Sequence, residues 1–235
     1  MDLGTAFGLL LGLGLISIGI ISNNGDPMWF LDGDSLLIVL GGTFAATLVN
    51  YPLRDIQGLL NILSVAFKKH ILNHAAVELA INEKDPARLR SYLELELGNV
   101  ERRHSLGQEI FLYMGAYAPA FGMLGTVLGL IIMMTNFAES QTGAVVGFEF
   151  NVADRFADLL GGMGLALITT FYGVLLSNLV FLPLAGKLKR NSEEELMIKD
   201  IMVEGIIGIH AKDHPLSLRE KLMTFVPQSQ RVEAQ

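Results

Sequence analysis

The sequence contains no cysteine and few charged residues. Without cysteine the chain has no disulfide, no thiolate nucleophile and no cysteine-ligated metal site. Charged residues make up 17% of the 235 residues, against about 25% in ordinary soluble domains, whereas hydrophobic residues make up 51%. This composition excludes an intrinsically disordered chain, and the net charge of −7 argues against nucleic acid as a partner.

Charge is missing altogether from four long blocks. They contain no Asp, Glu, Lys, Arg or His and comprise Leu3–Gly25, Ser35–Leu53, Ile110–Ala138 and Leu159–Gly186. A helix of about 20 apolar residues crosses the hydrocarbon core of a bilayer. The sequence therefore predicts an all-α membrane protein with four transmembrane helices. No positively charged region precedes the first block, so we expect that block to remain in the mature protein as a helix.

The basic residues predict the orientation of the four spans. Of the 17 Lys and Arg, eight lie in residues 54–109, eight lie in the tail from residue 187, and Arg155 is the only other. The positive-inside rule places both basic segments, and with them both termini, in the cytoplasm. The predicted divisions are spans 1 and 2 with a short periplasmic link (1–53), a cytoplasmic helical segment (54–109), spans 3 and 4 with their link (110–186) and a cytoplasmic helical tail (187–235).

Local signals predict helices in the cytoplasmic parts. Asp85 followed by Pro86 is typical of a helix start, because Asp caps the first turn and proline fits its first position. Ser192 followed by three glutamates predicts another start. The run Asp213-His214-Pro215 predicts a break, with a last short helix from Pro215 to Phe225.

The sequence shows no motif for catalysis. No Gly-Lys-Ser/Thr follows the glycines, as a phosphate-binding loop requires, and no nucleophile stands with a base. His70 and His74, like His210 and His214, have the spacing of metal ligands on a helix, but neither pair has a convincing third ligand. We therefore predict neither an enzyme nor a metal site, and no cofactor.

Spans 3 and 4 nevertheless carry small and polar residues with helical spacing. Pro119 has no N–H, so it leaves the carbonyl of Gly115 without a helical donor. One face of each span collects such residues: Pro119, Gly122, Thr126 and Gly129 in span 3, and Gly162, Ala166, Thr169, Thr170, Gly173 and Ser177 in span 4. Two such faces turned together would surround a narrow space with oxygens, which hard cations such as Na⁺ prefer. Ordinary helix packing explains the same pattern, so both interpretations stay open.

The absence of charge from the spans limits what the chain does alone. Proton relays need an ionisable group at membrane depth, and none of the four blocks has one. If the protein moves ions, a partner must supply the charged group. The first span also repeats glycine at positions 4, 8 and 12, which predicts close contact with another helix.

Several stretches of the sequence resemble a known family of membrane proteins. The stretches "APAFGMLGTVLGL", "LALITTFYGVLLSNLVFLPLAGKL" and "IMVEGIIGIHAKDHP" resemble the A subunit of the bacterial flagellar stator, the MotA/PomA type, within the wider MotA/TolQ/ExbB superfamily. The resemblance implies a homopentamer in the inner membrane around two copies of a single-span B subunit. That B subunit carries a membrane Asp and a peptidoglycan-binding domain. Ion passage past the Asp would turn the ring and drive a cytoplasmic rotor.

The resemblance also implies roles for individual residues. Pro119 and Pro183 match the two membrane-boundary prolines that couple ion flux to cytoplasmic movement. Thr126, Thr169 and Thr170 match the hydroxyls that line the ion path. All three positions are threonine in sodium-type members, so Na⁺ is favoured over H⁺ as the transported ion, in agreement with the preference of hard cations for oxygen.

One segment departs from the family pattern. Residues 54–84 have no good counterpart of the stretch that engages the rotor. The charged residues Arg88, Arg90, Glu94 and Glu96 are possible rotor contacts, and a solvated helix face is the alternative. Two other functions stay open: a stator-like subunit of a non-flagellar envelope motor, for gliding or as an ExbB/TolQ-like energiser, and a non-conducting scaffold or self-sufficient channel.

Overall fold

The computed structural model describes residues 3–56, 58, 85–143 and 152–225, and the regular elements in these ranges are all helices. The chain divides into two compact units. Unit 1 comprises Met1–Leu60 and Glu109–Ala185, and unit 2 comprises Asn61–Gln108 and Gly186–Gln235. Residues 59–84 and 144–151 lie outside the described ranges, and with them most of the segment that departs from the family pattern, the pair His70 and His74, and much of the second outer link.

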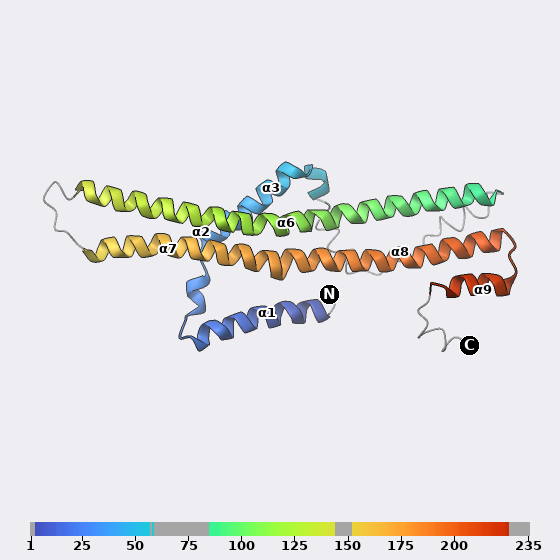
Figure 1. Ribbon diagram of the computed structural model, residues 1–235, viewed down its shortest axis with the longest axis horizontal. Helices are drawn as coiled ribbons and strands as arrows, with labels where there is room; N and C mark the ends of the chain where they lie inside the picture. The colour runs from blue at the N-terminus through green and yellow to red at the C-terminus, as the bar shows by residue number, and fades with distance from the viewer. Residues whose placement is uncertain (1–2, 57, 59–84, 144–151, 226–235) are drawn as a thin grey trace. The chain divides into compact units, whose positions relative to one another are not determined.

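Figure 1 shows the helices of both units. The first part of the chain forms α1 (Leu3–Ser22), η1 (Pro27–Phe30), α2 (Gly33–Leu36), the π-helical η2 (Leu37–Gly41) and α3 (Gly42–Asn50). The second forms α6 (Pro86–Gly143), α7 (Val152–Leu175), the π-helical η4 (Leu176–Phe181), α8 (Leu182–His210) and α9 (Pro215–Met223). Four stretches are long and apolar enough to cross a membrane: Gly4–Ser22, Pro27–Asn50, Pro86–Asn136 and Leu159–His210. The prediction of four transmembrane helices in an all-α fold is confirmed.

The second span is held in unit 1 by a stripe of small side chains. Its fully buried residues recur at every fourth position: Ser35, Val39, Thr43 and Thr47. The hydroxyl of Thr43 donates to the carbonyl oxygen of Val39 at 2.6 Å, and that of Thr47 to the carbonyl of Thr43 at 2.7 Å. Each hydroxyl is satisfied within its own helix, so the stripe packs without an unpaired donor from either threonine. Periodicity in this span was not among the sequence predictions.

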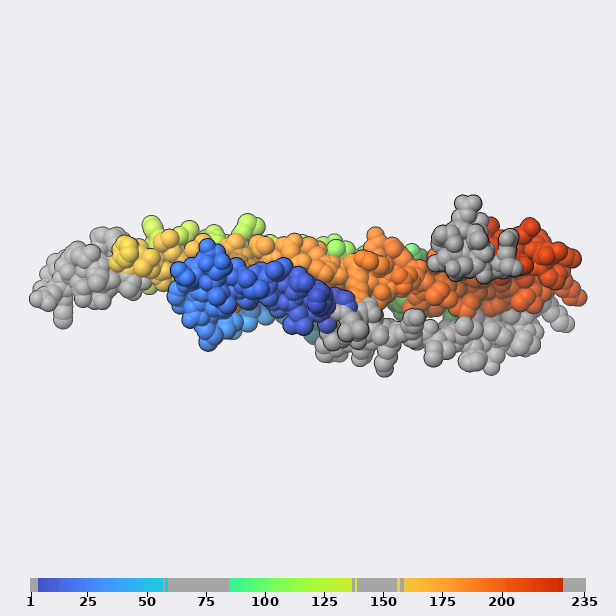
Figure 2. Space-filling model, turned by 90° about the horizontal axis from the view of Figure 1, so that it is seen from below, coloured from blue at the N-terminus to red at the C-terminus, as the bar shows by residue number. Residues whose placement is uncertain are grey.

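The first span packs through one of its repeated glycines. A Cβ on Gly12 would lie 2.7 Å from Cδ1 of Leu179 in η4, whereas Gly4 and Gly8 have no atom of another residue so near. Figure 2 shows α1, in dark blue, in front of orange residues of the long helices in this view. The prediction of close contact therefore holds within this chain for one glycine of the three.

In unit 2, α6 packs against α8 through apolar side chains. Leu89, Leu93 and Val100 of α6 are buried, as are Leu188 and Ser192 of α8. The prediction of a helix start at Ser192 is wrong, because α8 runs without a break from Leu182 to His210. Ser192 lies inside this helix, and its hydroxyl oxygen is 2.9 Å from Nδ1 of His104.

The other helix boundaries of unit 2 agree with the local signals. Helix α6 begins at Pro86, where the backbone N–H of Ala87 donates to the Asp85 carboxylate at 3.0 Å. Helix α8 ends at His210, and Lys212 follows with a left-handed φ of 58°. Helix α9 then begins at Pro215. Both the start at Pro86 and the break before Pro215 are confirmed.

Candidate ion path and coupling site

Glycines bring α6 and α7 into backbone contact within unit 1. Three glycines of α6 lie against α7: Gly122, Gly125 and Gly129. A Cβ on Gly125 would lie 2.5 Å from both Cβ and Oγ1 of Thr169, and one on Gly129 would lie 2.7 Å from the carbonyl oxygen of Gly162. No side chain larger than hydrogen fits at either position without displacing a neighbour.

This contact corrects the expected arrangement of the two small-residue faces. The sequence pattern left two interpretations open, an oxygen-lined space and ordinary helix packing, and at Gly122, Gly125 and Gly129 the two helices pack directly against each other. The face of α6 in contact carries Gly125 where the spacing had placed Thr126, because residues three and four apart both approach a packed helix. The two helices therefore leave no space between them at these glycines.

The three predicted ion-path threonines divide into two kinds. Thr169 is fully buried, and its hydroxyl donates to the carbonyls of Leu165 at 2.9 Å and Ala166 at 3.0 Å. Thr126 and Thr170 are half-buried. Their hydroxyls donate to carbonyls of their own helices, at 2.6 Å and 3.2 Å.

The hydrogen bonds of these hydroxyls determine whether their oxygens can still act as acceptors or ligands. A threonine hydroxyl has one hydrogen and two lone pairs. Once its hydrogen is donated to the helix, the oxygen acts as an acceptor. This holds for Thr126 and Thr170, whose side chains belong to half-buried residues, and the backbone of Thr170 lies against Gly122, one turn from Thr126.

The two predicted coupling prolines lie at irregular points of the helices. Pro119 lies inside α6, where the Gly115 carbonyl loses its helical donor. The hydroxyl of Ser177 donates to that carbonyl at 2.6 Å. Pro183 is exposed at the second position of α8, directly after the π-helical η4. Ser177 carried no role of its own in the sequence analysis, because its partner is 62 residues away.

A tyrosine of α7 fastens the turn between the first two spans. The Tyr172 hydroxyl donates to the carbonyl of Phe30 and accepts from the backbone N–H of Asp32 at 3.2 Å. The rings of Phe30 and Phe171 lie 5.2 Å apart, and the Asp32 carboxylate caps α2 by accepting from the N–H of Ser35 at 2.8 Å. These contacts of Tyr172 with Phe30 and Asp32 were not predicted, because no motif or spacing in the sequence marks Tyr172 as their partner.

The four possible rotor-contact residues lie on the first three turns of α6. Arg90 forms an ion pair with Glu204 of α8 and lies 3.4 Å from Glu94, while Arg88 lies 3.8 Å from Asp85. Nζ of Lys221 in α9 lies 2.5 Å from the same Glu204. Glu96 is exposed. Arg90 thus belongs to an internal network of unit 2 as well as to the charged surface.

This network lowers the pKa of Glu204 below its usual value of 4.5. The hydrogen bond from Lys221 is the largest cause, and the positive charge of Arg90 adds to it against the opposing effect of burial. By contrast, burial and the nearby carboxylates of Glu101 and Glu204 raise the pKa of Asp200. Within the described residues, no three His, Asp or Glu side chains are grouped as a metal site would require.

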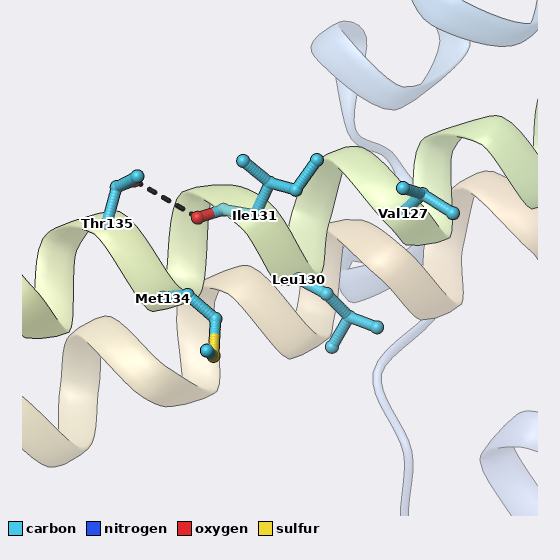
Figure 3. Close-up of a pocket in the computed structure, with 5 residues that line it drawn as sticks. All are labelled: Val127, Leu130, Ile131, Met134 and Thr135. Atoms are coloured by element: carbon cyan, nitrogen blue, oxygen red, sulfur yellow. Dashed lines mark hydrogen bonds between the residues drawn. The ribbon is translucent and has the colours of Figure 1, made fainter.

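The C-terminal half of α6 carries a shallow apolar depression. Val127, Leu130, Ile131, Met134 and Thr135 line it, and the Thr135 hydroxyl bonds back to the Ile131 carbonyl at 3.1 Å (Figure 3). Four of its five lining side chains are hydrocarbon or thioether, so it is poorly suited to hold an ion.

Four stretches are apolar enough to cross a membrane, and each overlaps one of the uncharged blocks. Together with the glycine contacts between α6 and α7, they define a multi-pass membrane protein. The family model described as the MotA/TolQ/ExbB proton channel family matches residues 61–200. The chain belongs to this family.

Two curated proteins and one solved structure place the chain more narrowly. It is 32% identical to the uncharacterized protein YtxD of Bacillus subtilis, over 95% of this chain and 90% of that protein. It is 34% identical to motility protein A of Borreliella burgdorferi, over 67% of this chain and 54% of that protein. The flagellar MotAB stator complex from Bacillus subtilis contains a chain of the same fold, with a TM-score of 0.78, 22% identity and 97% of both chains covered.

Proposed function

We propose that this chain is the A subunit of an ion-driven rotary stator that turns an ion gradient into torque, most directly for flagellar rotation. Its partner is a single-span B subunit that carries the ion-binding Asp in the membrane and a peptidoglycan-binding domain outside it. Five copies of the chain surround two copies of the partner. Support comes from the family, from the motility proteins among the relatives and from the MotAB fold.

One observation carries this proposal beyond the family. The four blocks that form the spans hold no Asp, Glu, Lys, Arg or His, although an ion-conducting assembly needs a titratable or charged group at membrane depth. The charged group therefore belongs to the partner. This chain supplies the oxygens beside it and the long helices α6 and α8, which continue from the spans into unit 2.

The transported ion in this proposal is Na⁺. Thr126 and Thr170 each donate their hydroxyl hydrogen to their own helix, so the oxygen lone pairs remain for a cation. Hard cations prefer such oxygens. The proposal assigns no enzymatic activity to the chain, and it places both termini and unit 2 in the cytoplasm of a bacterial cell, on the side where the basic residues are concentrated.

The decisive experiment reconstitutes the chain with its B partner in proteoliposomes and varies Na⁺ and H⁺ separately. We expect Na⁺ uptake that requires the partner and is lost when its membrane Asp is changed to Asn. Uptake of H⁺ along a proton gradient, with the Na⁺ concentration held constant, would identify H⁺ as the transported ion instead. Uptake by this chain without a partner would indicate a self-sufficient channel, and no uptake in either gradient would favour a scaffold.

The driven process needs a separate test in cells. Deletion of the gene should abolish swimming while flagellar filaments remain, and a plasmid copy should restore it. Cells that keep swimming but lose gliding or another envelope process would assign the chain to a non-flagellar motor.

A further inference from the structure

The carbonyl oxygen of Gly115 in α6 lacks its usual hydrogen bond within the helix. In an uninterrupted α-helix it would accept the N–H of residue 119, but proline has no N–H to donate. Gly115 is buried, and a Cβ there would lie 2.8 Å from Cδ2 of Leu182, so the neighbouring helix closes the position. A carbonyl left unpaired in such a site is costly, because neither water nor lipid replaces the missing donor.

Ser177 supplies the missing donor from another helix. Its hydroxyl donates to the Gly115 carbonyl at 2.6 Å, and its side chain is almost wholly buried. Thr169 and Thr170, in the same helix region as Ser177, donate to carbonyls of their own helix instead. The Ser177 bond is therefore a tie between helices and not a local back-bond.

The backbone of Ser177 lies in the irregular part of the helix that precedes Pro183. Ser177 lies in the π-helical η4, and its carbonyl accepts the N–H of Leu182 five residues later. Pro183 follows directly and withholds its own donor from the preceding turn. A single residue thus contacts the carbonyl freed by Pro119 through its side chain and the residue beside Pro183 through its backbone.

We propose that Ser177 is a positioning residue that holds the Pro119 and Pro183 segments in register, so that displacement of one segment is transmitted to the other. It touches no ion and acts through the two helices that it joins. This inference rests on the proposed function and on the coupling role that the family resemblance implies for the two prolines.

A pair of variants of similar shape tests the coupling role. Both variants add one methyl group to Cβ, but Ser177→Thr keeps the hydroxyl, whereas Ser177→Val has a second methyl group in its place. Side-chain hydrogen bonds between membrane helices change equilibria by about three- to tenfold. We expect Ser177→Val to lower rotation speed per unit of ion flux by about threefold or more, at equal numbers of assembled complexes, and Ser177→Thr to retain most of it. Equal losses in both variants, or no loss in either, would overturn the proposal.

A second measurement tests the bond without relying on motor activity. Alanine has the backbone N–H that proline lacks, so Pro119→Ala gives Gly115 its helical donor back. Ser177→Ala should therefore lower the thermal stability of the detergent-solubilised complex when Pro119 is present and have little effect when it is combined with Pro119→Ala. Ser17→Ala is the control, because that hydroxyl bonds within its own helix and should have the same small effect with and without Pro119→Ala.

The stability measurement and the activity measurement distinguish a failure of the Ser177 inference from a failure of the proposed function. Additive effects of Pro119→Ala and Ser177→Ala would show that the hydroxyl does not replace the proline's missing donor, and would overturn the inference. A wild-type complex that neither conducts nor rotates would contradict the proposed function, while the stability cycle would still report on the bond.

Discussion

Gly125 and Thr169 fix how closely α6 approaches α7, because a Cβ on the glycine would lie 2.5 Å from the Cβ of the threonine. We expect Gly125→Ala to force the helices apart. Overpacking of this kind costs about 1–3 kcal/mol in a well-packed core. Thermal melting of the purified protein and its yield from membranes should both fall.

A glycine of α7 provides the matched control. A Cβ on Gly164 meets no atom within 4 Å, so Gly164→Ala adds the same methyl group without a clash. Its melting temperature should stay close to that of the wild type. Equal effects of the two substitutions would show that the α6–α7 contact does not depend on Gly125.

The half-buried threonines should determine the affinity for the transported ion. Thr126→Ala and Thr170→Ala each remove one oxygen, and hydrogen bonds or ligands to charged groups contribute about 1.5–3 kcal/mol. We expect the Na⁺ concentration for half-maximal flux to rise by roughly tenfold or more, and Ser at either position to restore most of the affinity.

Thr135→Ala controls for the loss of a hydroxyl from α6, because Thr135 bonds back to Ile131 and Ile132 and lines only the shallow apolar depression. It should leave the Na⁺ dependence unchanged. Unchanged dependence in the Thr126 and Thr170 variants would remove these residues from the ion path.

Features encoded locally were predictable, and those that depend on contact between distant segments were not. The four spans and the helix start at Pro86 follow from nearby charge, hydropathy and capping. The bond between Ser177 and Gly115 depends on the register of two helices. Ser192 has a good capping sequence, yet tertiary packing against α6 keeps it inside α8.

The candidate site shows the same division. The threonines and prolines could be predicted as candidate site residues, because their spacing and their match to the family motifs can be read directly from the sequence. The spacing placed Thr126 on the face in contact, since a three- and a four-residue step are equally compatible with helical spacing. The glycine contacts decide between them, with Gly125 meeting Thr169.

Glu204 should hold α9 onto α8. Its carboxylate pairs with Lys221 of α9 at 2.5 Å and with Arg90 of α6, and its side chain is only 17% exposed. Glu204→Gln removes the charge with little change in shape. We expect faster amide hydrogen exchange in α9. Glu193→Gln should have no such effect, because the exposed pair of Glu193 and Lys189 at 3.9 Å is of the kind that contributes little.

The contribution of Glu204 should also depend on pH. Its pKa is lowered below 4.5 in the folded chain, so the unfolded state binds a proton first as the pH falls. The stabilisation is therefore complete above pH 4.5 and is lost at lower pH, as the folded carboxylate is protonated. The protection of α9, that is, the intrinsic exchange rate divided by the observed rate at the same pH, should fall below that value in the wild type and change much less in the Glu204→Gln variant.

Arg90 should act on α9 as well as on any rotor contact. We expect Arg90→Ala to accelerate exchange in α9, because it removes one of the two cations paired with Glu204. Arg88→Ala should not, since Arg88 pairs only at 3.8 Å with Asp85 on the exposed surface. If Arg90→Ala slows rotation without altering α9, its role lies at the rotor surface and not in the internal network.

Tyr172 should hold the turn between the first two spans in place. Tyr172→Phe keeps the buried ring and removes the hydroxyl that bonds to Phe30 and Asp32. A net loss of about 0.5–1.5 kcal/mol per hydrogen bond is expected. Amide exchange and protease cleavage at the turn should increase, whereas Tyr92→Phe, on an exposed side chain of α6, should change neither. Protection equal to that of the wild type in the Tyr172→Phe variant would mean that packing of Phe30 against Phe171 is sufficient to hold the turn.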